Sequence, residues 1–510
     1  MLFRFKAGDG TADGLIACLA GLACLFGLAA MLITLSGHDY AYFLPRLYDN
    51  HLFYGVNGLA VKEYTASFCA GIFEFANPQS LALSLPQLLS SAFGPLLGMQ
   101  LTFVLMSAMA GMGLYVCARF AGLGPMPAAI SATMMAFHGF LISRMVVGHV
   151  TFFNFAMVPM IAGLLLHGVD HASQRRLVQA IACGGGASLL AVSTVYGGAG
   201  VILLQIVLAV VLILIVCGGF SVGVRYWLTF YGALSVLALF MAAPKLEAML
   251  AVTGNLTRTQ YPLPGVAPVD MPAMLFQTLF WIPDAGSLSD KLQNAELFFE
   301  FHEWNFSVTP VWLVLVGAGL IIGRRAGQKG NASGWRPTPR RMVLIVLMCL
   351  PIALNVYLPV WNQFLKTVPI LDSSINMVRW LVVYTPLLCL LVGWSWRHLD
   401  RLRALPLVAL MLCLGAIHYQ VISNRLAPDQ SYDRDIILSS WGNGRPPVID
   451  QVGAPIMTAA DGTRRPVHDT NFDHMFTLGR SNVLCYEPLF GYWLEHLPTR
   501  HVRLGSIGQP

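Results

Sequence analysis

The chain alternates between long apolar runs and shorter polar connectors. Each run is roughly 20 residues long, the length at which a helix crosses a bilayer. We predict eleven membrane-spanning helices, at about 14–36, 95–117, 125–142, 152–168, 177–196, 199–217, 226–244, 307–323, 342–358, 380–396 and 404–422. The first run is too long for a signal peptide and lacks a small-residue cleavage site, so we expect it to remain as a helix.

The composition agrees with a chain that lies mostly in lipid. Hydrophobic residues occupy 56% of the 510 positions and charged residues 11%, and the mean hydropathy is +0.64. A soluble protein carries about 25% charged residues. The charges here are too few to coat a water-facing surface, so the sequence predicts an all-α polytopic membrane protein.

The basic residues between the runs indicate the orientation of the chain. When Arg4 and Lys6 are placed in the cytoplasm, alternation puts most of the basic connectors there as well. The net charge of +6 therefore reflects membrane topology, and we expect no nucleic-acid partner. The opposite side receives the loops 37–94 and 245–306 and a small water-facing tail, 423–510.

These boundaries divide the chain into four parts. We expect a seven-helix module over 1–244, the second large outer loop over 245–306, a four-helix module over 307–422, and the tail. The predicted location is an inner (plasma) membrane, with the N-terminus in the cytoplasm and the C-terminus in the periplasm.

The first outer loop begins with a carboxylate at the membrane surface. Asp39 directly follows the first run. Apolar residues at helical spacing over 40–53 predict an interfacial helix, with Arg46 and Asp49 turned toward water, and a second interfacial segment follows Asn77-Pro78. Two roles stay open for Asp39: capping the first of these helices, or acting as a general base at the head of a lipid.

The chain resembles the GT-C superfamily of membrane glycosyltransferases. In that superfamily an acidic residue follows the first span, two juxtamembrane helices lie in a long outer loop, and seven spans precede a second large loop. Within it the chain is most similar to the bacterial YfhO-like branch. The similar stretches are Phe137-His138-Gly139-Phe140 through Arg144, Gly148-His149 to Pro159, Glu303-Trp304-Asn305-Phe306, and Tyr486-Glu487-Pro488-Leu489-Phe490-Gly491-Tyr492.

The resemblance implies transfer of a sugar, with inversion, from a polyprenyl-phosphate donor to a lipid, glycan or protein acceptor on the periplasmic face. By position, Asp39 would be the general base. The chain departs from the pattern because His38-Asp39 stands where several relatives have an acidic pair. A second carboxylate role in this loop would fall to Glu63 or Glu74.

A leaving phosphate needs cations at the membrane interface. Arg379 begins the tenth run beside Trp380, where a guanidinium can either meet a lipid phosphate or anchor the helix. Arg144 and His149 bracket a short outer turn, and an Arg so near hydrocarbon is costly unless it is paired or hydrated. Lys366 is a further outer cation. We predict that substrate is bound by His38, Arg46, Arg144, His149, Lys245, Arg258, Glu303 and Arg379.

Glu300, His302 and Glu303 crowd the end of the second large loop. Carboxylates and imidazoles are common metal ligands, but three donors in four residues do not define a metal site. We interpret them as solvated loop residues, predict no metal ligand and no cofactor, and leave a divalent ion open. Cys69 and Cys485 lie outside the apolar runs, and sequence alone does not set whether they pair.

Two functions from other classes compete with an enzyme. A transporter or lipid flippase would use charges within its spans and show repeat symmetry, and the sequence shows neither clearly. A scaffold protein would use the outer loops only as a docking surface.

Overall fold

The computed structural model describes residues 33–482, with gaps at 70, 220–223, 254–261, 296–298, 326–337, 369–370, 373, 375, 398–432, 443–446, 450, 454–455, 459–463 and 467–472. Within this part, seven helical segments are long and apolar enough to cross a membrane. They are Pro95–Phe120, Pro125–Val147, Val150–Ser173, Leu177–Tyr196, Ala199–Val216, Thr229–Val252 and Met377–Ser395. The protein is therefore a mostly helical membrane protein, as predicted.

These seven segments coincide with the second to seventh and the tenth of the predicted runs. The eighth and ninth runs are also helical, as α14 (Val311–Arg325) and α15 (Pro339–Asn355). The described parts of these two helices contain 15 and 17 residues, fewer than the roughly 20 residues of a typical transmembrane helix. Most of the first run and all of the eleventh lie outside the described residues, so the number eleven stays a prediction.

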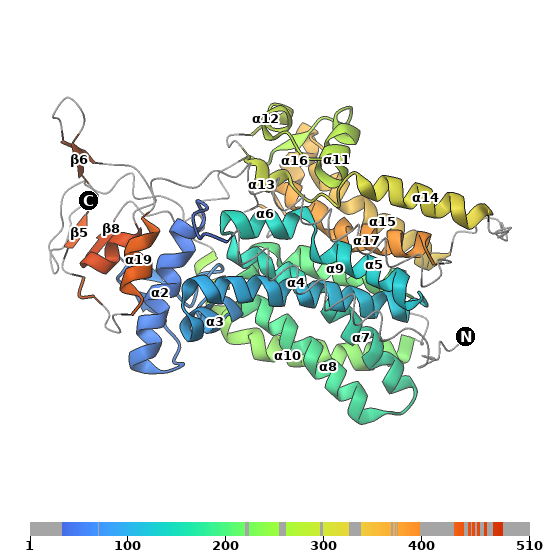
Figure 1. Ribbon diagram of the computed structural model, residues 1–510, viewed down its shortest axis with the longest axis horizontal. Helices are drawn as coiled ribbons and strands as arrows, with labels where there is room; N and C mark the ends of the chain where they lie inside the picture. Colours follow the sequence, from blue (N-terminus) through green and yellow to red (C-terminus); the bar gives the residue numbers. More distant parts are fainter. Residues whose placement is uncertain are drawn as a thin grey trace.

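The spans lie side by side along the long axis of the molecule (Figure 1). They are formed by α4 (Pro95–Phe120), α5 (Pro125–Ala136) with α6 (Gly139–Val147), η1 (Val150–Met157) with α7 (Val158–Ser173), α8 (Leu177–Tyr196), η2 (Ala199–Ile202) with α9 (Leu203–Val216), α10 (Val224–Thr253), and η5 (Met377–Val383) with α17 (Tyr384–Ser395). Proline opens α4 and α5, where its missing N–H costs no helical hydrogen bond.

Shorter elements occupy the connections. The helices are α2 (Tyr40–Asn57), α3 (Leu85–Phe93), α11 (Met271–Phe280), α12 (Ala285–Ser289), α13 (Phe301–Trp304), α16 (Pro359–Leu365), α19 (Arg434–Ser440) and η6 (Asp473–Leu478). The strands are β1 (Tyr64–Thr65), β2 (Ile72–Phe73), β3 (Gly265–Val266), β4 (Leu292–Gln293), β5 (Gln451–Gly453), β6 (Ile456–Thr458), β7 (Arg464–Pro466) and β8 (Arg480–Asn482). The strands pair as β1–β2, β3–β4 and β6–β7, all antiparallel, and β5–β8, which is parallel.

Helix α4 lies at the centre of the bundle and packs against α3, α5 and α7. Gly113 permits the close approach of α7, because a Cβ atom at this position would lie 2.2 Å from the backbone nitrogen of Met160. Phe103, Leu114 and Cys117 on α4 are fully buried in this core. The bundle thus gives rigid support to the segments at its ends.

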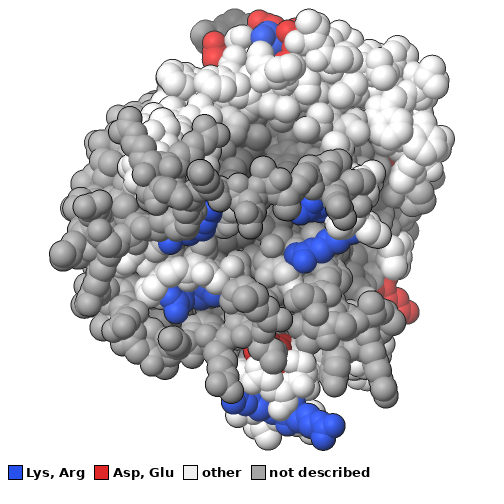
Figure 2. All heavy atoms as spheres, turned by 90° about the vertical axis from the view of Figure 1, so that its right-hand side faces the viewer, with Lys and Arg blue, Asp and Glu red and all other residues white. Residues whose placement is uncertain are grey.

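Basic side chains are present at one end of the bundle. Figure 2 views one end and shows Lys and Arg side chains spread across it. The described basic residues at helix ends and turns on this side include Arg119, Arg175, Arg176, Arg340, Arg341 and Arg397. Helices α2, α6 and α13 lie toward the opposite end (Figure 1).

Helix α2 corrects one prediction about the first loop. It forms where it was expected, but Arg46 and Asp49 do not face water, because the two residues are only 3% and 7% exposed. The C-terminal part covers this helix, since α19 and η6 both pack against α2. The tail is therefore not a purely water-facing appendage, because Phe476 and Ile437 are completely buried.

Candidate functional site

Six of the nine predicted site residues meet at the end of the bundle away from the basic connectors. We define the outer cluster as these six together with Glu300 and His302, which lie among them. Its members come from the segment before α2, from α6 and the turn after it, from α13, and from η5; they are His38, Asp39, Arg144, His149, Glu300, His302, Glu303 and Arg379.

Two glycines bring the start of α2 against the end of α6. A Cβ atom at Gly37 would lie 2.4 Å from the carbonyl oxygens of Val146 and Val147, and one at Gly148 would lie 2.6 Å from Tyr40. Gly148 also has a φ of +94°, a conformation that only glycine adopts at little cost. The backbone N–H of Asp39 donates to the Val147 oxygen at 3.0 Å. This contact fixes Asp39 next to the turn that carries His149.

The side chain of Asp39 does not cap α2. It accepts no hydrogen bond from the first turn of the helix, so the capping role is not observed. Instead, its Oδ2 lies 3.0 Å from Nδ1 of His149 and its Oδ1 lies 3.4 Å from Nε2 of His38. The Asp39 side chain is 12% exposed.

The tautomer of His149 determines whether its Nδ1 can donate a hydrogen bond to Asp39. Nδ1 of His149 also lies 2.8 Å from Nη1 of Arg144, and an arginine can only donate. Burial lowers the pKa of His149, and Arg144 and Arg379 lower it further, to well below its ordinary value. A neutral ring whose Nδ1 accepts from Arg144 carries its proton on Nε2, so it cannot donate to Asp39. Oδ2 of Asp39 is therefore buried without a hydrogen-bond donor among the described residues.

Glu303 is the centre of the charged network. Arg144 donates to both of its carboxylate oxygens at 2.8 Å, and Arg379 donates to both at 2.8 and 2.6 Å. Asn376 adds a hydrogen bond of 2.7 Å. Burial by itself would raise the pKa of Glu303, but the two guanidinium groups outweigh burial and hold the pKa well below its ordinary value. Glu303 is thus a permanent anion that ties α6, α13 and η5 together.

An aromatic ring supports both guanidinium groups. The carbon Cζ of Arg144 lies 4.6 Å and that of Arg379 lies 4.8 Å from the centre of the Phe152 ring. Such contacts stabilise a cation by about 0.5–2 kcal/mol. His149 contacts the same ring edge-on, with centroids 4.1 Å apart. Phe152 therefore positions three members of the outer cluster.

The structure separates the predicted cations by their access to a ligand. Arg144 is completely buried, whereas the Arg379 side chain is 16% exposed. In this arrangement Arg144 acts on Glu303 and His149, whereas Arg379 has some surface that a phosphate can reach. Lys366 is half-buried and donates to the backbone oxygen of Asp372, so it is occupied within its own loop.

Three predicted binding residues do not join the outer cluster. Arg46 lies about 10 Å along α2 from Asp39, at a rise of about 1.5 Å per residue. Its Nη1 forms an ion pair with Oδ2 of Asp473 at 2.5 Å. Lys245 is buried on α10 and donates to the backbone oxygens of Phe75 and Asn77. Arg258 lies outside the described residues.

The remaining carboxylates of the first loop are separate from Asp39 as well. Glu74 is 1% exposed and accepts from Ser80 at 2.7 Å, so it has a structural role, while Glu63 is exposed. Cys69 takes part in a disulfide bond. Cys485 lies outside the described residues, so whether it is the partner of Cys69 stays open.

The interpretation of Glu300, His302 and Glu303 as solvated loop residues is wrong for two of them. His302 is 5% and Glu303 is 7% exposed, whereas the Glu300 side chain is 53% exposed. Trp304 anchors this segment, because its Nε1 donates to the Phe299 oxygen at 3.0 Å and the residue is fully buried. The alternation of polar and aromatic residues around Trp304 was the sequence signal for a buried segment.

Two members of the outer cluster, Glu300 and His302, were not among the predicted site residues, and Asn376, which donates to Glu303, was missed as well. His302 lies 3.5 Å from Glu300 and 3.4 Å from Glu303. Burial lowers its pKa, but the two carboxylates outweigh burial and raise the pKa above its ordinary value. Sequence spacing does not place Asn376 opposite Glu303, because the two residues are 73 positions apart.

The outer cluster combines a carboxylate oxygen that can take up a proton, a neutral imidazole beside it, and a guanidinium that is partly open. A scan against protein-family models finds no match to the chain, and a search of curated proteins finds none either.

Proposed function

We propose that the protein is an integral membrane glycosyltransferase of the GT-C type. It would transfer a sugar from a polyprenyl-phosphate donor to a lipid, glycan or protein acceptor, on the periplasmic side of a bacterial inner membrane. In this proposal the hydroxyl of the acceptor loses its proton to Asp39 as its oxygen attacks the anomeric carbon. The bond from that carbon to the phosphate oxygen breaks, the configuration inverts, and polyprenyl phosphate leaves.

One observation carries the proposal. Oδ2 of Asp39 is buried beside His149 and accepts no hydrogen bond from the described residues, so it has a lone pair for the proton of an acceptor. Most buried carboxylate oxygens are hydrogen-bonded. An exception at the outer end of a membrane bundle therefore favours proton transfer over a structural role.

The charges around Asp39 also support a phosphate leaving group. Arg144 and Arg379 bring two positive charges beside Glu303, and Asp39 and Glu300 add further negative charge nearby, so a phosphate would meet the local charge of Arg379 and not a net positive cluster. Arg379 would contact the phosphate through its exposed part, and Arg144 and Glu303 would hold it in position. A fixed cation stabilises the charge that develops on a leaving phosphate.

The experiment is a donor screen with the purified full chain in lipid nanodiscs. Polyprenyl-phosphate sugars that differ only in the sugar are supplied one at a time with envelope lipids and glycans as acceptors. The products are resolved by mass spectrometry. We expect release of polyprenyl phosphate with one donor and the appearance of a glycosylated acceptor.

The rival transporter gives a different outcome when the same chain is reconstituted in sealed lipid vesicles. A flippase would move the intact lipid-linked sugar to the other leaflet and release no carrier phosphate. Translocation without cleavage, for every donor in the panel, would overturn the proposed enzyme.

A further inference from the structure

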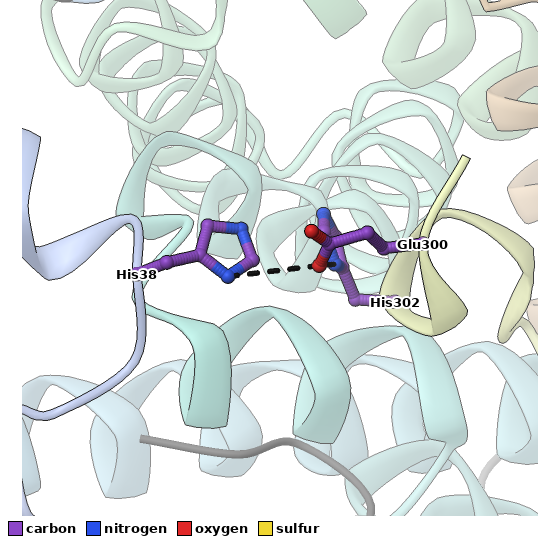
Figure 3. A group of neighbouring side chains, drawn as sticks. All are labelled: His38, Glu300 and His302. Carbon is purple, nitrogen blue, oxygen red and sulfur yellow. Dashed lines mark ion pairs between the residues drawn. The ribbon is translucent and has the colours of Figure 1, made fainter. Parts of the chain in front are cut away.

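Three donor atoms in the outer cluster face one another without forming hydrogen bonds. Nδ1 of His38 lies 3.6 Å and Nδ1 of His302 lies 3.5 Å from the same oxygen, Oε2 of Glu300. At such separations a side-chain hydrogen bond is absent or very weak. Figure 3 shows that His38 approaches from the segment before α2, and Glu300 and His302 from the segment of α13.

These separations fit ligands around one metal ion. In a tetrahedral zinc site the bonds to nitrogen and oxygen are about 2.0–2.1 Å, so neighbouring ligand atoms lie about 3.4 Å apart. One possible ligand atom from each of His38, Glu300 and His302 lies within 4.8 Å of the other two. Two imidazoles and one carboxylate also form a known set of zinc ligands in enzymes.

A buried atom points to the same conclusion independently. His302 is 5% exposed, yet its Nδ1 has no hydrogen-bond partner among the described residues. A buried polar atom without a partner is costly and calls for an explanation. An ion bound by Nδ1 would provide one.

The outer nitrogens of both imidazoles face carboxylates. Nε2 of His38 lies 3.4 Å from Oδ1 of Asp39, and Nε2 of His302 lies 3.4 Å from Oε1 of Glu303. Metal-binding histidines usually direct their second nitrogen to a carboxylate, which orients the ring and strengthens it as a ligand. Both rings have this arrangement here.

We propose that His38, Glu300 and His302 bind a divalent transition-metal ion, with zinc the best match to the ligand types. The ion would bind Nδ1 of each imidazole and Oε2 of Glu300. Because the protein supplies three ligands, the fourth position is open to water or to an anionic oxygen such as that of a phosphate. Metal binding is measured without substrate, so the inference does not depend on the proposed sugar transfer.

A second grouping shares His302 but fits an ion less well. Asp39, His149 and His302 also place their donor atoms within 4.8 Å of one another. Nδ1 of His149, however, already accepts a hydrogen bond from Arg144, and both Arg144 and Arg379 lower its pKa through their positive charge. Because this hydrogen bond occupies Nδ1 of His149, we assign the ion to His38, Glu300 and His302.

The test is metal counting on the full-length chain, purified without a histidine tag and stripped with a chelator. After dialysis against zinc, mass spectrometry of the metal should give one zinc ion per chain. Cobalt serves as a second probe, since a tetrahedral cobalt site absorbs visible light far more strongly than an octahedral one. We expect Glu300→Gln and His38→Gln each to weaken zinc binding by at least about tenfold. Loss of a residue that only supports a zinc ligand already weakens binding by about 10–100-fold, and these two residues would be ligands themselves.

The half-exposed position of Glu300 makes Glu300→Gln a safe variant for folding. Glu63→Gln is the matched control, because Glu63 is an exposed carboxylate elsewhere in the outer loops, and it should bind zinc like the natural chain. Zinc should also raise the unfolding temperature of the natural chain and of Glu63→Gln, but not that of Glu300→Gln.

Two results would overturn the proposal. One is zinc binding well below one ion per chain with no tetrahedral cobalt spectrum. The other is binding that survives both Glu300→Gln and His38→Gln but is lost in His149→Gln, which would assign the ion to Asp39, His149 and His302.

Discussion

Two aspartates ten residues apart on one side of the fold have opposite surroundings. Asp49 in α2 accepts hydrogen bonds from Lys62, from Thr65 at 2.8 Å and from Ser67 at 2.8 Å, so both of its oxygens are in use. Asp39, directly before α2, has one oxygen near His38 and the other buried without a hydrogen-bond donor in the described part of the chain. A carboxylate with every lone pair engaged stabilises a fold, whereas one with an open lone pair can accept a proton. The comparison therefore assigns a structural role to Asp49 and leaves Asp39, ten residues earlier, as the carboxylate that can accept a proton.

The sharpest test of this comparison is Asp39→Asn. General-base catalysis contributes about 10²–10⁴-fold to a rate, so we expect transfer, measured as release of polyprenyl phosphate, to fall by a factor in this range. The unfolding temperature should stay unchanged, because Oδ2 of Asp39 accepts no hydrogen bond from the described residues and the substitution therefore breaks none there. A variant that transfers sugar at the natural rate would remove Asp39 as the base.

The next largest effect should follow Glu303→Gln. This change leaves Arg144, which is fully buried, without its bidentate partner. Breaking a buried ion pair from one side costs about 3–5 kcal/mol, and thermal unfolding in detergent measures the loss. Glu63→Gln, on an exposed carboxylate, should leave the unfolding temperature unchanged. Equal stability of the two variants would show that the network does not hold the bundle.

Asp49→Asn should reverse the pattern of Asp39→Asn. It leaves the ammonium group of Lys62, which is 6% exposed, without a charge partner. A buried charged group that loses its hydrogen bond costs about 2–3 kcal/mol. We expect a lower unfolding temperature but a normal rate of transfer per folded molecule. If the rate falls as steeply as in Asp39→Asn, the division between the two aspartates does not hold.

The smallest effect is expected for two tyrosines at either end of α2. Tyr40 donates to the Met145 oxygen at 2.8 Å, close to the turn that carries His149, whereas Tyr54 donates to the Ala82 oxygen. Each Phe variant should lose about 1 kcal/mol of unfolding free energy. Only Tyr40→Phe should also slow transfer, by less than about tenfold, because it loosens the contact that positions Asp39. A parallel kinetic assay of both variants distinguishes these outcomes.

The sequence predicted the helical architecture because apolar runs of membrane length report directly on lipid. It also identified Asp39, Arg144, His149, Glu303 and Arg379, each of which carries a charge or a titratable ring at the end of an apolar run. What it could not give is which of these residues touch, since contacts such as Arg144 with Glu303 join positions 159 residues apart.

The errors share one physical cause. Arg46, Asp49 and His302 were assigned to water because polar residues in loops are usually solvated. Here each is buried beside a polar partner: Arg46 by Asp473, which is remote in the chain, Asp49 by Lys62 in the same loop, and His302 by the neighbouring Glu303. The spacing of apolar residues within one segment does not predict which other segment of the chain packs over it.

The two ion pairs of Glu303, with Arg144 and with Arg379, join parts of the chain that were predicted to belong to different modules. Arg144 belongs to the predicted module 1–244, whereas Glu303 and Arg379 lie beyond it. A fragment that ends at 244 would enclose a guanidinium group with no counter-charge from Glu303, at a cost comparable to a large share of the stability of an ordinary domain. The early helices and the late ones should therefore mature as one cooperative unit, and an attempt to express either half alone should yield protein that the cell degrades.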